Sequence, residues 1–125
     1  MKYNLMIVDD SRIVHAEITN MLEGSEFNVV ACCRSGEAAL EEYGPVNPDV
    51  VTMDIVMPGI DGLETCRRLI EKWPDARILM ISSLAYGSTT ENSEELGAKG
   101  FLFKPFTKES LLEGLRGALK SIAQN

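Results

Sequence analysis

Three aspartates and one lysine in this chain each follow a short apolar run. Asp9 and Asp10 follow the first run, Asp54 ends a later one, and Lys104 follows the last. Runs this short and apolar, bounded by Gly and Pro, are typical of buried strands. In open parallel sheets, ligand chemistry gathers at the carboxyl ends of the strands. We therefore expect these four side chains to form a cation site beside an anion site.

The acidic residues have the chemistry of a magnesium site. Two adjacent carboxylates repel each other unless a cation compensates them, and Mg²⁺ prefers oxygen ligands from one or two carboxylates plus a phosphate. We expect Asp10 and Asp54 to bind the ion directly, with the backbone carbonyl of Val56, and Asp9 to bind through water. Mn²⁺ is an alternative ion for the same ligands. A competing interpretation is an acidic helix start at Asp9 and Asp10, which the helix dipole would favour.

Asp54 is suited to act as a nucleophile, because aspartate carboxylates form covalent phosphoryl intermediates. A phosphoryl group in transfer needs its oxygens neutralised, and the ammonium of Lys104 can contact one of them. A hydroxyl at the end of the fourth apolar run, that of Ser82, can contact another. Ser83 is the competing choice, with helix capping as its alternative role.

The elements that position these residues alternate along the chain. Apolar runs predict five strands, at residues 4–9, 27–33, 49–54, 77–82 and 100–104. Helical periodicity predicts helices at residues 11–24, 36 to about 43, 61–73 and from 107 onward, with a weak and polar fourth helix at 86–97. This alternation indicates an α/β fold, a doubly wound parallel sheet with helices on both faces.

Composition narrows the class of protein. With 125 residues, 45% hydrophobic and 25% charged, the chain is expected to be one domain covering residues 1–125. A net charge of −7 argues against direct binding of nucleic acid or anionic membranes. The N-terminus leads straight into a strand too short for a signal peptide or membrane span, so a cytoplasmic location without membrane insertion is expected. Cys32 and Cys33 are expected on opposite faces of a strand, as free thiols.

Taken together, these motifs resemble the receiver domain of two-component response regulators, of the single-domain chemotaxis type. The resemblance extends over nearly the whole chain. Its motifs are the acidic pair, the Asp-x-x-Met-Pro-x-x-Asp-Gly stretch at 54–62, the hydroxyl of Ser82, and the Gly-Ala-x-x-Phe-x-x-Lys-Pro-Phe stretch at 97–106. It implies a flavodoxin-like sheet of order 2-1-3-4-5, which is the known order of this family.

The resemblance also implies a function. A partner histidine kinase would transfer a phosphoryl group from phosphohistidine to Asp54 in a Mg²⁺-dependent reaction. Ser82 and Phe101 would be the switch pair, and a downstream protein would bind the face formed by the fourth helix, fifth strand and fifth helix (the 4–5–5 face). It further implies a cis peptide bond between Lys104 and Pro105, which only X–Pro bonds adopt at modest cost.

Such a protein would be a signalling switch rather than a turnover enzyme. The alternative is a Mg²⁺-dependent phosphohydrolase, but this would need a second aspartate at the position of Val56. A flavin-binding module is a third hypothesis, disfavoured because the acidic first loop would repel phosphate. The resemblance also implies that the positions two residues after Asp54 and Ser82 tune the loss of the phosphoryl group. Here these are Val56 and Leu84, whose apolar side chains cannot orient an attacking water, so we predict slow self-dephosphorylation.

Overall fold

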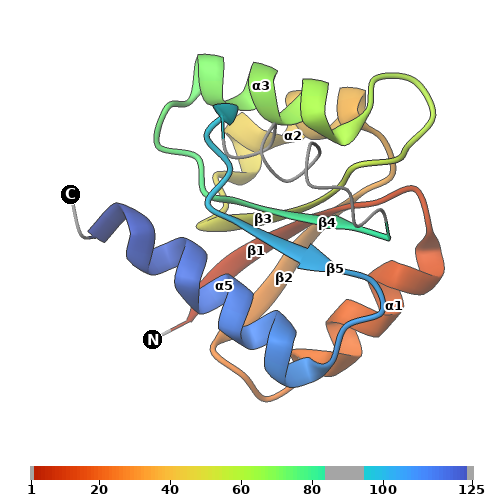
Figure 1. Cartoon of the computed structure of the whole chain (residues 1–125), viewed down its shortest axis with the longest axis vertical. Coiled ribbons are helices and arrows are strands. Elements are labelled where there is room, and N and C mark those ends of the chain that lie inside the picture. The colour runs from red at the N-terminus through yellow and green to blue at the C-terminus, as the bar shows by residue number, and fades with distance from the viewer. Residues whose placement is uncertain (1, 84–94, 124–125) are drawn as a thin grey trace.

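A parallel sheet of five strands forms the centre of the molecule (Figure 1). The computed structural model describes residues 2–83 and 95–123. The strands lie in the order β2-β1-β3-β4-β5, which confirms the predicted topology. Their bounds are β1 Tyr3–Val8, β2 Phe27–Cys33, β3 Val50–Asp54, β4 Ile78–Ser82 and β5 Gly100–Phe103, each within two residues of the sequence prediction.

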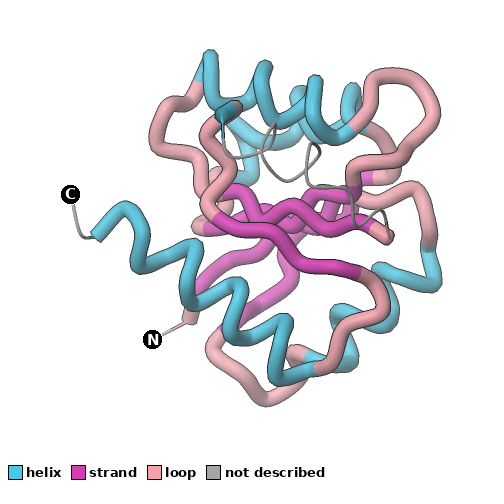
Figure 2. Tube along the Cα trace, in the orientation of Figure 1, coloured by secondary structure: helices cyan, strands magenta, loops and turns pink. Residues whose placement is uncertain are grey.

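Helices cover both faces of this sheet, as Figure 2 shows. Helices α2 (Gly36–Val46) and α3 (Gly62–Lys72) pack on one face, and α1 (Arg12–Met21) and α5 (Lys108–Ala123) pack on the other. The weak fourth helix predicted at residues 86–97 lies outside the described residues except for its last three positions. The 4–5–5 face is therefore described only at β5 and α5.

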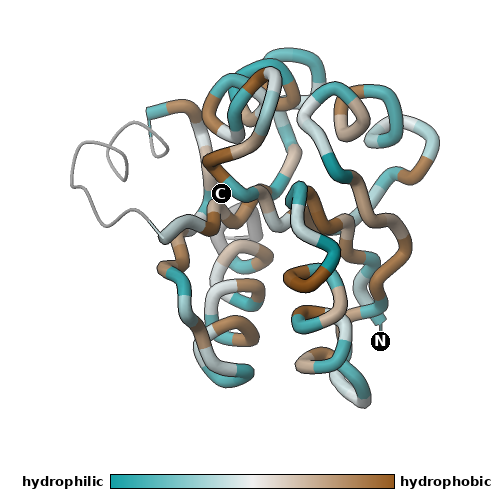
Figure 3. The backbone as a smooth tube through the Cα atoms, turned by 90° about the vertical axis from the view of Figure 1, so that its right-hand side faces the viewer, coloured by the Kyte–Doolittle hydropathy of each residue, from teal (hydrophilic) through white to brown (hydrophobic). Residues whose placement is uncertain are grey.

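The central strands β1, β3 and β4 are largely apolar on both sides because both of their faces are covered. One core cluster joins β1, β3 and β4 to α2 and α3, and the other joins them to α1 and α5. Figure 3 shows hydrophobic and hydrophilic segments alternating along the helices, as expected where each helix buries one side. The central three strands are thereby fixed from both faces, which gives the ends of those strands a rigid base.

Polar side chains set where the first three helices begin. The Ser11 hydroxyl accepts a hydrogen bond from the Val14 N–H, and the Asp61 carboxylate accepts one from the Glu64 N–H. Each satisfies a backbone donor that the first turn of a helix leaves free. Ser35 caps α2 in the same way. Two of these caps, Ser11 and Asp61, begin helices directly behind residues of the predicted site.

The prediction that α2 ends near Tyr43 is wrong. The helix continues through Pro45 to Val46, and Asn47 follows it in a left-handed conformation. A proline normally clashes with the Cβ of the residue before it. Here that residue is Gly44, which has no Cβ and lies against the ring of Trp73. The Gly-Pro pair therefore stays in the last turn of the helix.

The two cysteines of β2 differ in exposure. Cys32 is exposed and Cys33 is buried, as strand alternation predicted, and both are free thiols. Among the described residues, no helix combines the length and the hydropathy that a bilayer crossing requires.

Candidate functional site

Strand register brings the predicted site residues to one edge of the sheet, on the right-hand side of Figure 1. Val8 pairs with Met53, so Asp9 leaves β1 beside Asp54 at the end of β3. The next strands continue this alignment, since Asp54 pairs with Ile81 in β4, one residue before Ser82. Lys104 follows the last residue of β5. The carboxyl ends of four strands thus meet at this edge, as the sequence predicted.

Three carboxylates converge there. Asp9, Asp10 and Asp54 each offer a carboxylate oxygen, and the three oxygens lie within 4.8 Å of one another. Asp9 is 2% exposed and Asp54 is 7% exposed, while Asp10 is half-buried. Hard oxygen donors at this spacing are the ligands that Mg²⁺ uses in proteins. The donor set therefore fits a divalent cation, with Asp10 as its most accessible ligand.

Lys104 supplies the positive charge of the site. Its Nζ lies 3.4 Å from Asp54 Oδ1 and 3.2 Å from Asp9 Oδ2. Its backbone N–H donates a 2.9 Å hydrogen bond to the Ser82 carbonyl, which fixes the end of β5 against the end of β4. The Lys104–Pro105 peptide bond is cis. One ammonium thus contacts two of the three carboxylates.

The charges at this edge are unbalanced, and the pKa values reflect it. Burial and the charge of Asp9 raise the pKa of Asp54 from 3.8 to about 6, against the lowering effect of Lys104. Burial alone would lower the pKa of Lys104, but the carboxylates of Asp54 and Asp9 outweigh it and raise that pKa. The pocket therefore holds more negative charge than one lysine can compensate, which is the condition a bound cation relieves.

Close backbone contact fixes the loop behind Asp54. The N–H of Gly62 donates a 2.7 Å hydrogen bond to the Ile55 carbonyl. A Cβ at Gly62 would overlap the Asp54 carbonyl oxygen and lie 2.7 Å from the Ile55 Cα. Only glycine allows α3 to begin this close to the end of β3. The Gly62 of the sequence motif therefore acts on Asp54 through the backbone.

The residues predicted to form the switch pair share one face of the sheet. Ser82 is fully buried at the end of β4, and its strand neighbour Met80 pairs with Phe101 in β5. Phe101 is half-buried and its ring lies 4.9 Å from the ring of Phe103, which is 45% exposed. Ser83, the competing hydroxyl, is exposed one residue further along.

Exposed apolar residues lie beside the site. Val56, two residues after Asp54, is 58% exposed. A pocket of about 300 Å³ adjoins Lys104 between α1 and the start of α5, and it is lined by Val14, Glu17, Met21, Ser83, Lys104, Pro105 and Phe106. Leu84, the other residue predicted to slow dephosphorylation, lies outside the described residues.

From the sequence, His15, the only histidine, is expected at a surface or half-buried position of the first helix, and this prediction is wrong. Its side chain is 8% exposed, and Nε2 lies 2.7 Å from the carbonyl oxygen of Asp9. The signal was present in the helix periodicity. His15 precedes the buried Ile18 and Leu22 by three and seven positions, which places it on the buried side of α1. Arg34, which contacts the Asp10 carbonyl, was also missed.

Comparison with known proteins agrees with this geometry. Residues 5–116 match the model of the response regulator receiver domain. The chain is 39% identical over 116 residues to the chemotaxis protein CheY of Listeria monocytogenes, covering 93% of this chain and 98% of that protein. It is 35% identical over 119 residues to CheY of Bacillus subtilis, covering 95% and 99%.

Solved structures give the same result. In the CheX–CheY–BeF3–Mg²⁺ complex of Borrelia burgdorferi, one chain superposes with a TM-score of 0.86 at 32% identity, covering 90% of this chain and 85% of that one. The response regulator domain of Thermotoga maritima CheB superposes with a TM-score of 0.88 at 29% identity, covering 96% and 98%. From the matched residues, the shared sheet order and the acidic edge, we conclude that this chain belongs to the response regulator receiver family and is of the CheY type.

Proposed function

We propose that Asp54 is the phosphoacceptor of this receiver and that Asp10 and Asp54, with the backbone carbonyl of Val56, hold Mg²⁺ beside it. Asp9 would contact the ion through water. The observation that carries this proposal is the position of Lys104 Nζ, 3.4 Å from Asp54 and 3.2 Å from Asp9, next to three converging carboxylates. When bound, the cation would neutralise the carboxylates and contact a phosphoryl oxygen.

The transfer itself is a nucleophilic displacement. A carboxylate oxygen of Asp54 forms a bond to phosphorus as the phosphorus–nitrogen bond of a phosphohistidine breaks, and the electron pair of that bond stays on the imidazole nitrogen. The Lys104 ammonium and the Ser82 hydroxyl stabilise charge on the phosphoryl oxygens. Because most of the work is electrostatic, a small set of fixed charges is sufficient.

The phosphodonor would be a histidine kinase that approaches the open edge of the sheet. Its phosphohistidine must reach Asp54, so its surface must cover the ends of the strands. The apolar pocket beside Lys104 and the exposed Val56 offer hydrophobic surface for that contact. Because the pocket adjoins the site directly, we assign it to contact with the kinase and not to an independent function.

The signal would leave through the 4–5–5 face. A phosphoryl group adds charge beside Ser82, and Phe101 lies on the same face of the sheet. Movement of the hydroxyl toward the phosphate and of the ring toward the interior would change the surface around Phe103. A downstream protein binds that surface in one state better than in the other. The protein would thus act as a switch and not as a turnover enzyme.

Incubation with acetyl phosphate and Mg²⁺, followed by intact mass measurement, tests the proposal. We expect one phosphoryl adduct on the unmodified chain and none on Asp54→Asn. Addition of EDTA should also prevent the adduct. Steady release of many phosphates per protein would contradict the proposal and would indicate a phosphohydrolase. The sequence argues against that activity, because the apolar Val56 stands where a second catalytic aspartate would be needed.

A further inference from the structure

His15 contacts the acidic site from a buried position on α1. Its Nε2 lies 2.7 Å from the Asp9 carbonyl oxygen. A carbonyl oxygen can only accept, so Nε2 carries the hydrogen and donates it. A buried hydrogen bond of this length is electrostatically strong because little water screens it.

This hydrogen bond completes the attachment of Asp9. The backbone N–H of Asp9 donates to the Cys33 carbonyl at 3.0 Å, its Oδ1 accepts from the Ser11 N–H at 2.9 Å, and its Oδ2 lies 3.2 Å from Lys104 Nζ. The carbonyl oxygen is the remaining polar atom, and His15 binds it. Every polar atom of Asp9 is therefore fixed by a different part of the chain.

The peptide unit that follows Asp9 leads directly to Asp10. The carbonyl bound by His15 belongs to this unit, so His15 sets the plane of the peptide that joins the two aspartates. Rotation of that plane would move the Asp10 backbone and redirect its carboxylate. Only Ser11 separates Asp10 from the first residue of α1. The direction of the Asp10 carboxylate thus depends on the hydrogen bond between His15 and the backbone carbonyl of Asp9.

A second contact to the acidic pair differs from the first. Arg34 Nε and Nη2 both lie 3.4 Å from the Asp10 carbonyl oxygen, and this side chain is exposed. Water can replace such long, exposed hydrogen bonds at little cost, whereas water does not reach the buried carbonyl beside His15. Arg34 therefore provides a matched control for His15.

We propose that His15 is a positioning residue for the cation site: its Nε2–H fixes the peptide between Asp9 and Asp10 and thereby sets the affinity of the site for Mg²⁺. The proposal rests on the proposed function, because it concerns the same cation. A residue that only filled space on α1 would not influence Mg²⁺ affinity once its volume was retained.

Calorimetric titration of the purified chain with Mg²⁺ distinguishes these roles. His15→Met keeps the volume without a donor, and we expect it to weaken Mg²⁺ binding by about three- to tenfold, the effect of one lost hydrogen bond. His15→Gln places an amide N–H near the position of Nε2 and should restore the affinity to within about twofold. Arg34→Lys keeps the positive charge but removes the two guanidinium contacts, and it should change the affinity by less than about twofold.

A second pair of variants keeps the test valid if His15→Met does not fold. Asn and Gln are both polar, but the Asn amide is too short to reach the Asp9 carbonyl, so His15→Asn should bind Mg²⁺ more weakly than His15→Gln. Equal affinities for these two variants, or wild-type affinity in folded His15→Met, would overturn the proposal alone. Absence of Mg²⁺ binding by the unmodified chain would overturn the proposed function as well.

Discussion

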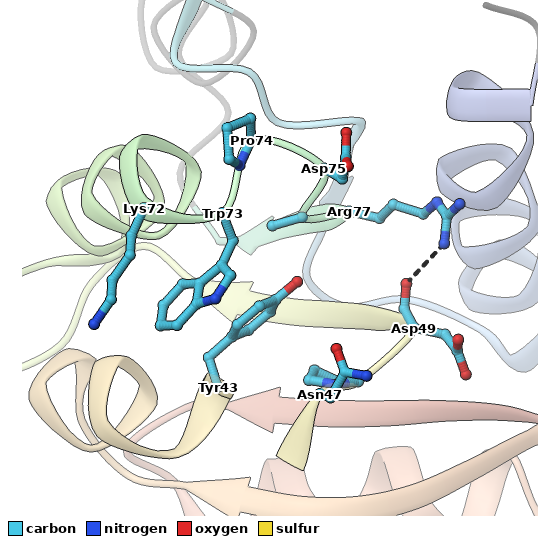
Figure 4. A pocket seen from close by; sticks show the side chains of 10 residues that line it. Tyr43, Asn47, Asp49, Lys72, Trp73, Pro74, Asp75 and Arg77 are labelled. Carbon is cyan, nitrogen blue, oxygen red and sulfur yellow. Dashed lines mark hydrogen bonds between the residues drawn. The ribbon is translucent and has the colours of Figure 1, made fainter. Parts of the chain in front are cut away.

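The two edges of the sheet hold similar charged residues in different balance. At the carboxyl edge, three carboxylates within 4.8 Å of one another meet the ammonium of Lys104. At the amino edge, a pocket of about 390 Å³ includes two acids, Asp49 and Asp75, and two bases, Lys72 and Arg77 (Figure 4). The carboxyl edge has an excess of negative charge, whereas the charges that line the pocket of the amino edge balance.

At the amino edge, Asp49, Lys72 and Arg77 each contact an uncharged group of the chain, although the buried Arg77 Nε has no hydrogen-bond partner among the described residues. Arg77 Nη1 lies 3.5 Å from the Asp49 carbonyl oxygen, and an Asp49 carboxylate oxygen accepts a 2.6 Å hydrogen bond from the Asn4 N–H. The Lys72 ammonium lies 4.8 Å from the Trp73 ring, which packs against Tyr43 (Figure 4). Balanced charges of this kind stabilise the fold modestly. At the carboxyl edge, by contrast, three carboxylates lie beside one ammonium among residues 2–83 and 95–123, and this excess of negative charge indicates a ligand.

Replacing one lysine at each edge should give the largest difference between the two edges, measured as the rate of phosphorylation. Lys104→Met removes the charge that stabilises the phosphoryl oxygens, and we expect phosphorylation by acetyl phosphate to slow by about 10²–10³-fold. It also raises the pKa of Asp54 further, because Lys104 is the cation that lowers it. Stopped reactions analysed by intact mass would measure the rate.

Lys72→Met is the matched control for that variant. It removes a lysine of the amino edge and should leave the phosphorylation rate within about twofold of the unmodified chain. Equal rates for both variants would show that the ammonium of Lys104 contributes no more to the reaction than a distant surface lysine does.

The excess charge also predicts how stability depends on pH without metal. The pKa of Asp54 is about 6 in the folded protein and near 3.8 in the unfolded chain. Between these values the folded state binds more protons, so the free energy of unfolding decreases as the pH rises through this range. We expect a decrease of up to about 3 kcal/mol between pH 4 and pH 7, and Asp54→Asn should lack this contribution.

Urea unfolding in EDTA measures this effect as the difference between the two proteins at each pH. Above about pH 6, Asp54→Asn should be the more stable protein, and Mg²⁺ should reduce its advantage by binding the folded unmodified chain. A difference that does not vary with pH would show that Asp54 does not carry the excess charge.

Close backbone packing also constrains the carboxyl edge. A Cβ at Gly62 would overlap the Asp54 carbonyl, and backbone cannot move aside as a flexible side chain can. Gly62→Ala should lower the free energy of unfolding by about 1–3 kcal/mol and weaken Mg²⁺ binding as Asp54 shifts.

Gly117→Ala is the control for this change. Gly117 lies in α5, and a Cβ there meets no atom within 4 Å. We expect this variant to gain about 0.5–1 kcal/mol, since alanine favours a helix interior over glycine. Chemical unfolding measures the free energy of unfolding of Gly62→Ala and Gly117→Ala. Similar changes in the two variants would contradict the prediction.

The sequence predicted which residues form the site better than it predicted which residues hold them in position. Asp9, Asp54 and Lys104 were found because each directly follows an apolar run, and parallel strands bring such positions to one edge. The sheet order came from the family resemblance, since strand alternation alone does not fix it. The prediction for His15 fails because it rests on its neighbours Ala16 and Glu17 and not on its three-residue spacing from the buried Ile18.

The end of α2 was missed for a similar reason. Proline rules placed it before Pro45, but they assume a Cβ on the preceding residue, and Gly44 has none. Contacts made by backbone atoms, such as that of Gly62 with the Asp54 carbonyl, depend on how two elements meet in space. Residue types alone carry little information about such contacts, although the glycines that permit them are visible in the sequence.

The smallest expected effect concerns the lifetime of the phosphoryl group at the carboxyl edge. Val56 is 58% exposed beside the site, and its apolar side chain cannot orient a water for attack on phosphorus. Val56→Asn supplies an amide that can orient water but cannot take its proton. We therefore expect dephosphorylation to accelerate by about tenfold or less, below the roughly 10²-fold of a general base. Ile13→Asn makes the same change at a 73% exposed position of α1 and should leave the lifetime unaltered. Decay of the unmodified phosphoprotein within a few seconds in Mg²⁺ buffer, followed by intact mass, would contradict the prediction that the apolar residue protects the phosphoryl group.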